Sequence, residues 1–162
     1  MMKQTDGKRI EASMLELSPV LAELIRSGAA VRLTVTGNSM YPMLRDREDA
    51  VIIRASKKLR RLDVPLYVRD NGQLVLHRII GKKKDTYTMC GDNQLRKEKG
   101  ITKEQIIGVV ESFVRKGKTY SCTNRWYRLY AHLWVPLRKI RPLLLKWGVA
   151  LRSKQKKRQD EK

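Results

Sequence analysis

Three short segments contain residue types that could act as a nucleophile, a base and an orienting acid. Ser39 follows an alternating, strand-like segment and stands in a turn, where its hydroxyl can be exposed. A serine hydroxyl attacks a carbonyl carbon well only when a base removes its proton, and His77 titrates in a suitable range. Asp92, in a Gly-Asp-Asn turn, can hold the imidazole in one tautomer. Together these residue types predict acyl-transfer chemistry at Ser39.

Each of the three residues also has a purely structural interpretation. Ser39 can be an ordinary turn residue, and Asp92 can fix its own turn through a side-chain oxygen. His77, the only histidine between residues 30 and 122, can be a buried core residue with satisfied hydrogen bonds. The sequence leaves these interpretations open for each residue alone, so the catalytic interpretation depends on the three residues occurring together.

Residues next to Ser39 are candidates for the walls of a substrate site. Gly37 permits backbone angles that other residues avoid, and it lets a substrate chain approach closely. Asn38 is a candidate second donor to the oxyanion of an acyl-transfer reaction. Met40 and Pro42 are candidates for the pocket walls, with packing in the core as the alternative.

The spacing of apolar residues predicts a mainly β protein with helices at both ends. Helical spacing runs from Ser13 to Ser27, with Pro19 as an alternative start and Gly28 as the stop. The sequence Asp70-Asn71-Gly72 predicts a hairpin. Strands are expected at 31–36, 50–54, 65–69, 73–81, 85–90, 106–115 and 119–122. We therefore divide the chain into an N-terminal tail and helix (1–29), a β domain (30–123) and a basic helical tail (124–162).

Over roughly residues 30–115, the motifs and their order resemble the signal peptidase I family of serine endopeptidases. The segments that carry the resemblance are Thr36–Leu44 with Asp49, Asp63–Val68 with Leu76–Ile79, and Gly91–Asn93 with Ile107-Gly108. The resemblance is to the variant that uses serine and histidine. The usual bacterial enzymes, and the LexA-type peptidases of the same fold, have lysine where His77 stands. The resemblance implies a signal-peptidase/LexA-like complex β fold and an endopeptidase that cleaves a preprotein or precursor peptide through an acyl-enzyme.

The resemblance also implies roles for individual residues. It makes the backbone N–H of Ser39 the first donor of the oxyanion hole. Relatives of the serine–histidine type carry a second acid shortly after the Gly-Asp motif. Glu98 is therefore the reserve for the orienting role, for which Asp92 is preferred. The substrate is expected to pair as an extended strand with the edge at 31–36, with a small residue before the cut bond.

Three features depart from the family pattern. Leu62 precedes Asp63 where a glycine is common, and Arg47-Glu48 likewise precedes Asp49 without a glycine. Typical members also have an N-terminal membrane anchor, for which this sequence has no suitable apolar segment. We therefore expect the chemistry to face the cytoplasm, where the leader of a small precursor peptide is a plausible substrate.

The last part of the chain is basic and amphipathic. Residues 115–162 carry 15 basic and 2 acidic side chains, which is +13 of the total net charge of +20. Pro136 and Pro142 predict two shorter helices in place of a single long one. We expect residues 124–151 to lie in the plane of an anionic membrane surface, with packing on protein as the alternative. The apolar stripe, spaced four and three residues apart, is Trp126, Tyr130, Leu133, Leu137, Ile140, Leu144, Trp147 and Leu151.

Several other classes of protein are excluded by the sequence. The chain has no signal peptide pattern and no apolar run that could span a bilayer, so a peripheral membrane or cytoplasmic location is expected. It has no phosphate-binding loop and no dinucleotide fingerprint. Two histidines and two separated cysteines form no zinc motif. We therefore expect no cofactor and no metal.

Two alternative functions remain. The first is a catalytically inactive relative that binds peptides, and the second is a basic nucleic-acid-binding or LexA-like regulator, which the positive charge favours. Against the second, the basic segments 57–61 and 82–84 lack interleaved aromatic residues. The 29 residues before the first expected strand are also few for a helix-turn-helix. We therefore expect a peptide or preprotein partner and no nucleic acid.

Overall fold

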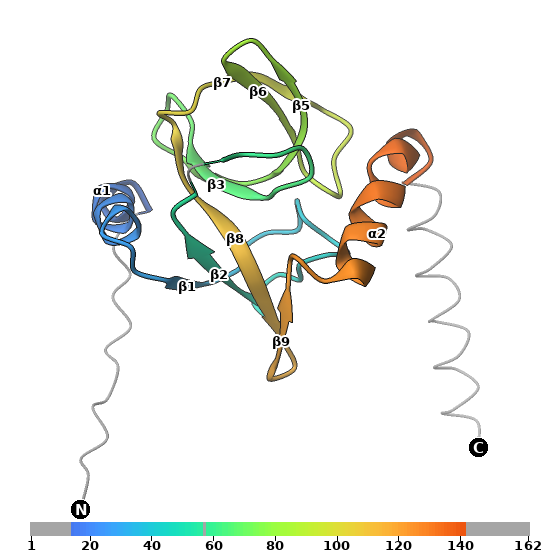
Figure 1. Cartoon of the computed structure of the whole chain (residues 1–162), viewed down its shortest axis with the longest axis horizontal. Coiled ribbons are helices and arrows are strands. Elements are labelled where there is room, and N and C mark those ends of the chain that lie inside the picture. The colour runs from blue at the N-terminus through green and yellow to red at the C-terminus, as the bar shows by residue number, and fades with distance from the viewer. Residues whose placement is uncertain (1–13, 57, 142–162) are drawn as a thin grey trace, which may run out of the picture.

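The computed structural model describes residues 14–56 and 58–141, and Figure 1 shows two curled antiparallel sheets between two helices. The helices α1 and α2 lie on opposite sides of the β structure (Figure 1). This arrangement confirms the expected mainly β fold with a helix before and after it. The elements, in chain order, are α1 (Met14–Arg26), β1 (Val31–Thr34), β2 (Ala50–Arg54), β3 (Pro65–Val68), β4 (Leu74–Leu76), β5 (Arg78–Lys83), β6 (Thr86–Cys90), β7 (Glu98–Ile101), β8 (Ile106–Arg115), β9 (Lys118–Ser121), α2 (Arg125–Trp134) and the 3-10 helix η1 (Pro136–Lys139).

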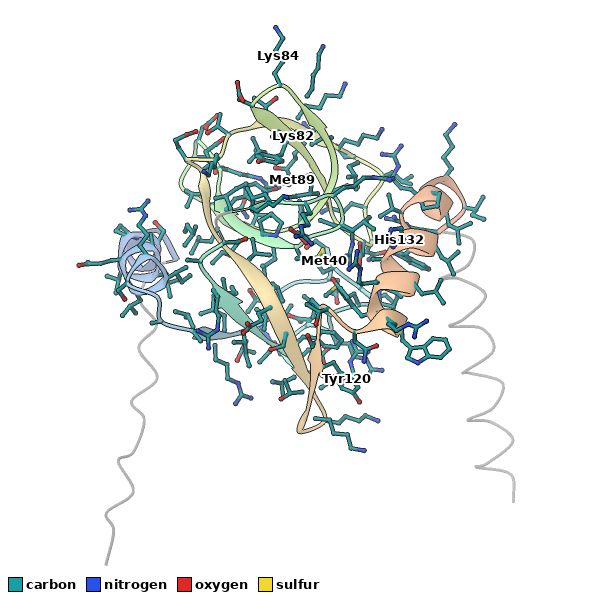
Figure 2. The ribbon with its side chains drawn as sticks, in the orientation of Figure 1. Met40, Lys82, Lys84, Met89, Tyr120 and His132 are labelled. Atoms are coloured by element: carbon teal, nitrogen blue, oxygen red, sulfur yellow. The ribbon has the colours of Figure 1, made fainter. Side chains whose placement is uncertain are left out.

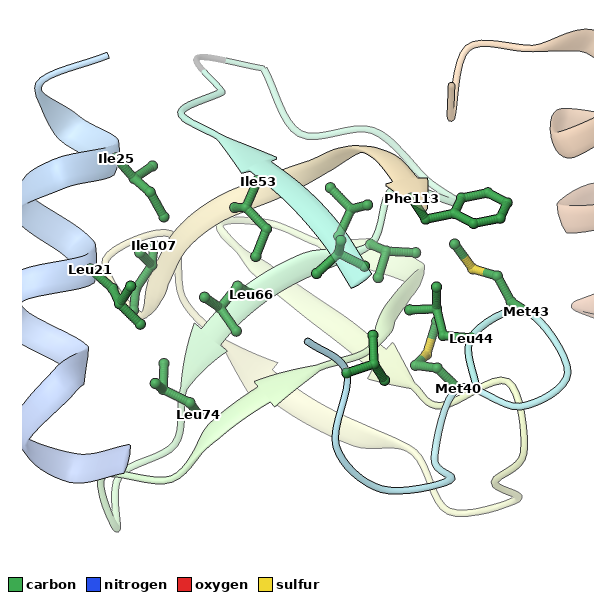
Figure 3. Close-up of a cluster of buried hydrophobic side chains, with 14 of the residues drawn as sticks. Leu21, Ile25, Met40, Met43, Leu44, Ile53, Leu66, Leu74, Ile107 and Phe113 are labelled. Carbon is green, nitrogen blue, oxygen red and sulfur yellow. The ribbon is translucent and has the colours of Figure 1, made fainter. Parts of the chain in front are cut away.

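Helix α1 begins at Met14 and contains Pro19, so the alternative start at Pro19 is wrong. The helix ends before Gly28, whose φ of +95° is a conformation that glycine adopts without steric cost. Leu21 and Ile25 are buried against the β structure (Figure 3). Helix α1 is therefore held by its apolar face, as the helical spacing predicted.

The larger sheet has the strand order β1-β2-β8-β3-β4, with β9 paired to β8. Strand β8 is the centre of this sheet, because one of its sides pairs with β2 and the other pairs first with β3 and then with β9. Strands β1 and β4 are the two ends of the order. Within the described residues, β1, β4 and β9 each pair with another strand on one side only, so β1 is a free edge, as expected.

The strand predicted over 73–81 is interrupted at His77. Its first part, β4, pairs with β3 in the larger sheet, whereas its second part, β5, pairs with β6 in the smaller sheet β5-β6-β7. His77 is the residue between them and has no strand assignment. The chain changes sheets at this residue, which places the imidazole where the two sheets meet.

Two apolar clusters fill the interior. The larger cluster joins α1, the larger sheet and the loop after β1, including Leu21, Ile53 and Leu44 (Figure 3). The smaller cluster lies around Tyr67 and Met89, between β3 and the smaller sheet. Most buried apolar residues come from strands that the alternating pattern predicted, and this alternation explains why the sheets form where they do.

Helix α2 ends just before Pro136, whereas Pro142, the other proline on which the prediction of two helices rested, lies outside the described residues. Asn124 accepts a hydrogen bond from the backbone N–H of Trp126 (2.8 Å) and so caps the start of α2, and η1 begins at Pro136. The rest of the expected stripe, Leu144 to Leu151, lies outside the described residues. Within residues 14–56 and 58–141, no helix is both long enough and apolar enough to cross a membrane.

Candidate active site

The loop between β1 and β2 carries Ser39, and hydrogen bonds fix it near both of its ends. Gly37 has a φ of +85°, and its N–H donates to Asp46 Oδ1 at 2.7 Å. At the other end, the carboxylate of buried Asp49 accepts hydrogen bonds from Arg115 of β8, with Nη2 at 2.7 Å. Ser39 therefore stands on a loop of fixed shape, although the loop has no regular secondary structure.

Apolar residues of the same loop insert into the core. Met40 and Leu44 are almost completely buried, and Figure 2 places Met40 in the interior of the molecule. Met40 also lines the cavity beside Ser39, so it has both of the roles considered for it. Pro42 is not among the described residues that line this cavity, and its carbonyl oxygen accepts a hydrogen bond from Arg115 (3.2 Å). This hydrogen bond involves only the backbone of Pro42, so the role of its side chain beside Ser39 stays a prediction.

Ser39 and His77 line the same cavity, which has a volume of about 660 Å³. Its walls include Gly37 and Asn38, two of the residues expected there, and also Leu33 of β1. The remaining walls include apolar residues of α1, β3 and β4, together with the polar residues Arg69, Gln73 and Gln94. Among the described residues, the Ser39 N–H has no hydrogen-bond acceptor and the Ser39 hydroxyl makes no hydrogen bond. Both groups are therefore available to a substrate.

The Nδ1 atom of His77 contacts two polar groups of the neighbouring strands. It lies 3.1 Å from the hydroxyl of Tyr67 on β3 and 3.1 Å from Oε1 of Glu98, the first residue of β7. The Tyr67 hydroxyl donates to the other oxygen of the same carboxylate, Oε2, at 2.9 Å. Because Nδ1 faces an acceptor, it carries the proton of the neutral imidazole, which leaves the lone pair on Nε2.

Burial sets the ionisation of this group of residues. His77 is only 1% exposed, and burial lowers its pKa from 6.5, although the nearby Glu98 charge acts in the opposite direction. Arg69 donates through Nε to Glu98 Oε2 at 2.8 Å, and this contact lowers the pKa of the carboxyl group. At neutral pH the arrangement is therefore a neutral imidazole beside a carboxylate, which is the state that a general base requires.

Asp92 does not have the position expected for the acid that orients His77. Both of its oxygens are occupied by buried Arg78, with Nε to Oδ1 at 2.9 Å and Nη2 to Oδ2 at 2.6 Å. Tyr130 of α2 also donates to Oδ2, at 3.2 Å. No hydrogen bond joins Asp92 to His77 among the described residues, and the reserve residue Glu98 is the carboxylate in contact. We correct the expectation for Asp92 accordingly, since an arginine on the adjacent position of β5 takes both carboxylate oxygens.

The turn that contains Asp92 supports the Ser39 loop directly. The N–H of Asn93 donates to the carbonyl oxygen of Ser39 at 2.8 Å, and its side-chain amide donates to the carbonyl oxygen of Asn38 at 3.2 Å. A Cβ atom on Gly91 would lie 2.5 Å from the same Ser39 oxygen, so only glycine permits this approach. The Gly-Asp-Asn motif thus positions the loop that carries Ser39.

Helix α2 and Arg141, the second residue after η1, contact this turn from the other side, and the sequence did not predict these contacts. Trp134 Nε1 donates to the carbonyl oxygen of Asp92 at 2.9 Å, and Arg141 Nη1 donates to the same oxygen at 3.0 Å. Tyr127 accepts from Arg78 Nη1 at 3.0 Å. Tyr127 and Trp134, seven residues apart, share the helix face that meets the β domain, and this spacing was the available signal.

A family profile matches most of this chain. No curated protein matches the chain. The profile of the family described as Peptidase S24-like matches residues 5–111, which is about two thirds of the chain. This family lies in the serine peptidase superfamily that also contains the LexA-type and signal peptidases, so the sequence resemblance found the superfamily. The chain belongs to the Peptidase S24-like family.

Proposed function

We propose that this protein is a serine endopeptidase of the signal peptidase type, which cleaves a preprotein or precursor peptide through an acyl-enzyme on Ser39. The observation that carries the proposal is the contact between Nδ1 of buried His77 and the Glu98 carboxylate. His77 also lines the cavity that Ser39 lines. In this proposal His77 is the base, Glu98 orients it, and the Ser39 N–H is one oxyanion donor. Asn38 is the candidate for the second donor.

The proposed reaction has two halves. In the first, the Ser39 hydroxyl oxygen attacks the peptide carbonyl carbon while its proton passes to His77 Nε2. The C–N bond then breaks, and the imidazolium returns the proton to the leaving amine. In the second half, His77 takes a proton from water, whose oxygen attacks the ester carbon. The C–O bond to Ser39 breaks and the serine regains a proton, which releases the carboxylic acid.

The edges of the larger sheet offer a binding mode for the substrate. Two strands with an unpaired side, β1 and β4, contribute to the cavity, with Leu33 from β1 and Val75 from β4. An extended peptide can add to such an edge through backbone hydrogen bonds. The apolar walls favour a substrate with apolar or small side chains before the cut bond.

A LexA-like self-cleaving peptidase is the second candidate, and the Peptidase S24-like match favours it. Two features favour the signal peptidase type instead. His77 stands where the LexA-type enzymes have lysine, and the open cavity between β1 and β4 can accept a separate chain. The two candidates differ in a measurable way, because self-cleavage is a unimolecular reaction.

The test is a cleavage assay on a library of unfolded peptides, read by mass spectrometry of new termini. The proposal predicts cuts at a defined set of sites by the wild-type protein and none by Ser39→Ala. Ser56→Ala, which removes an exposed hydroxyl in the loop after β2, is the matched control and is expected to cut normally. Cleavage of the chain itself, at a rate independent of its concentration and with no peptide products, would support the LexA-like candidate instead. No cutting of either kind would identify an inactive peptide-binding relative.

A further inference from the structure

Helix α2 lies on the side of the molecule opposite α1 (Figure 1), and α2 and η1 carry an exposed apolar stripe. Trp126 is 79% exposed and Leu133 is 57% exposed, which is unusual for side chains of this size. Three further apolar residues continue the stripe at helical spacing. The outer stripe consists of Trp126, Leu129, Leu133, Leu137 and Ile140.

This stripe differs from the one that the sequence predicted. Tyr130, a member of the predicted stripe, turns toward the β domain and donates to Asp92, whereas Leu129 is exposed in its place. The helix therefore has two separate faces. Its inner face is bonded to the Asp92 turn, so the outer face is presented in a fixed orientation and is not available to fold back onto the β domain.

The surroundings of the outer stripe are basic. Arg125 and Arg128 flank Trp126, and Lys139 adjoins Ile140. The sequence from 112 to 159 contains no aspartate or glutamate. A partner for this face must therefore offer both apolar contact and negative charge, and a bilayer that contains anionic lipids provides the two together.

We propose that the outer stripe of α2 and η1 docks the protein on the surface of an anionic lipid bilayer, with the helix axis in the membrane plane. Trp126 and the leucines enter the boundary between headgroups and acyl chains, and the arginines and Lys139 meet the lipid phosphates. A second copy of the same face fits less well, because pairing two such faces brings their basic residues together in a chain of net charge +20.

The experiment is flotation of the full chain with vesicles of phosphatidylcholine, either alone or with added phosphatidylglycerol. The wild-type protein is expected to float with the anionic vesicles and to float much less with the neutral ones or at high salt. The double variant Trp126→Ser/Leu133→Ser is expected to lower the ratio of bound to free protein by about tenfold or more.

The matched control is Val20→Ser/Leu24→Ser, which removes two exposed apolar side chains from the other helix, α1. This control is expected to float like the wild type. Unchanged far-ultraviolet circular dichroism shows that each variant is folded. Equal flotation of the Trp126→Ser/Leu133→Ser variant and the wild type would overturn the proposal, and so would equal flotation on neutral and anionic vesicles. A lipid-free dimer in light scattering that this variant abolishes would overturn it in favour of a second copy.

Discussion

His77 and Glu98, 21 positions apart in the sequence, meet with Nδ1 and Oε1 separated by 3.1 Å. The contact joins the point where the chain changes sheets to the first residue of β7. Glu98 pairs with Met89 of β6, and its carboxylate accepts a hydrogen bond from the hydroxyl of Tyr67 on β3. The pair gives His77 both a fixed tautomer and a partner for its positive charge.

Glu98→Gln keeps an oxygen that can accept a hydrogen bond from His77 and removes the negative charge. It therefore separates the effect on the tautomer from the effect on the imidazolium charge. The labelling rate of Ser39 by a serine-reactive phosphonate is expected to fall on the order of 10²-fold at its plateau, because the imidazolium loses its partner. In the wild type the rate declines as pH falls through the pKa of His77, which lies below 6.5. In Glu98→Gln this decline moves to still lower pH, because the carboxylate that raises the pKa is gone and Arg69, which lowers it, remains. An acid limb that moved to higher pH would contradict the assignment.

The hydroxyl of Tyr67 supports the same pair. Tyr67→Phe removes the group that donates to Glu98 Oε2 and contacts His77 Nδ1, and it leaves the aromatic ring in place. The free energy of unfolding is expected to fall by about 1 kcal/mol, as for one lost hydrogen bond. Labelling of Ser39 is expected to slow less than in Glu98→Gln, because Arg69 still holds the carboxylate. Urea denaturation and labelling rates measure the two effects, and a larger slowing than in Glu98→Gln would count against this order of importance.

Asp92 and Arg78 form a completely buried ion pair, so breaking it leaves a buried charge. Asp92→Asn is expected to reduce the free energy of unfolding by about 3–5 kcal/mol. The double variant Arg78→Met/Asp92→Leu removes both charges and is expected to be more stable than Asp92→Asn. Urea denaturation of the two variants is the measurement. A smaller loss of stability in Asp92→Asn than in the double variant would show that leaving Arg78 buried without its carboxylate partner is not costly.

A substitution at Gly91 tests whether the turn that contains Asp92 positions the loop that carries Ser39. In Gly91→Ala the new methyl group would meet the Ser39 carbonyl oxygen at 2.5 Å, so the loop must shift. We expect a loss of about 1–3 kcal/mol in stability, as for an overpacked site, together with slower labelling of Ser39. Gly81→Ala is the control, since its Cβ meets Thr88 at an ordinary 3.8 Å. Normal labelling in Gly91→Ala would show that the turn does not position Ser39.

The strands were largely predictable because alternation of apolar residues is a local property. Strand β2, Ala50–Arg54, has the predicted bounds, and the hairpin at Asp70-Asn71-Gly72 joins β3 to β4 as expected. Strand β7 was not predicted, because Glu98–Ile101 reads Glu-Lys-Gly-Ile and has no alternation. Asp92 was expected beside His77 in place of Glu98 because β7 was not predicted. The pairing of β7 with β6 is what brings Glu98 to His77.

The charge on Asp92 illustrates what a linear motif leaves undetermined. The sequence shows that Asp92 lies in a turn, but it does not show whether His77 or its neighbour Arg78 contacts the carboxylate. In the structure, Arg78 does. Adjacent residues of an extended chain point to opposite faces, so one residue of offset exchanges the partner. The spacing of Tyr127 and Trp134 indicates only that they share a helix face, whereas the groups they contact depend on tertiary packing.

Two departures from the family pattern have a visible structural consequence. Leu62, where glycine is common, adopts a φ of +79°, and Arg47 in the segment before Asp49 adopts a φ of +55°. These are left-handed conformations, which cost a residue other than glycine about 1–2 kcal/mol. Both turns therefore adopt backbone angles that glycine would reach at lower cost.

The most direct test of the central claim is the covalent labelling of Ser39 by a fluorophosphonate, mapped by mass spectrometry of the digested chain. The account predicts one adduct, on the peptide that contains Ser39, which disappears in Ser39→Ala and in His77→Ala and persists in Ser56→Ala. Labelling of a different residue, or undiminished labelling of Ser39 in folded His77→Ala, would contradict it.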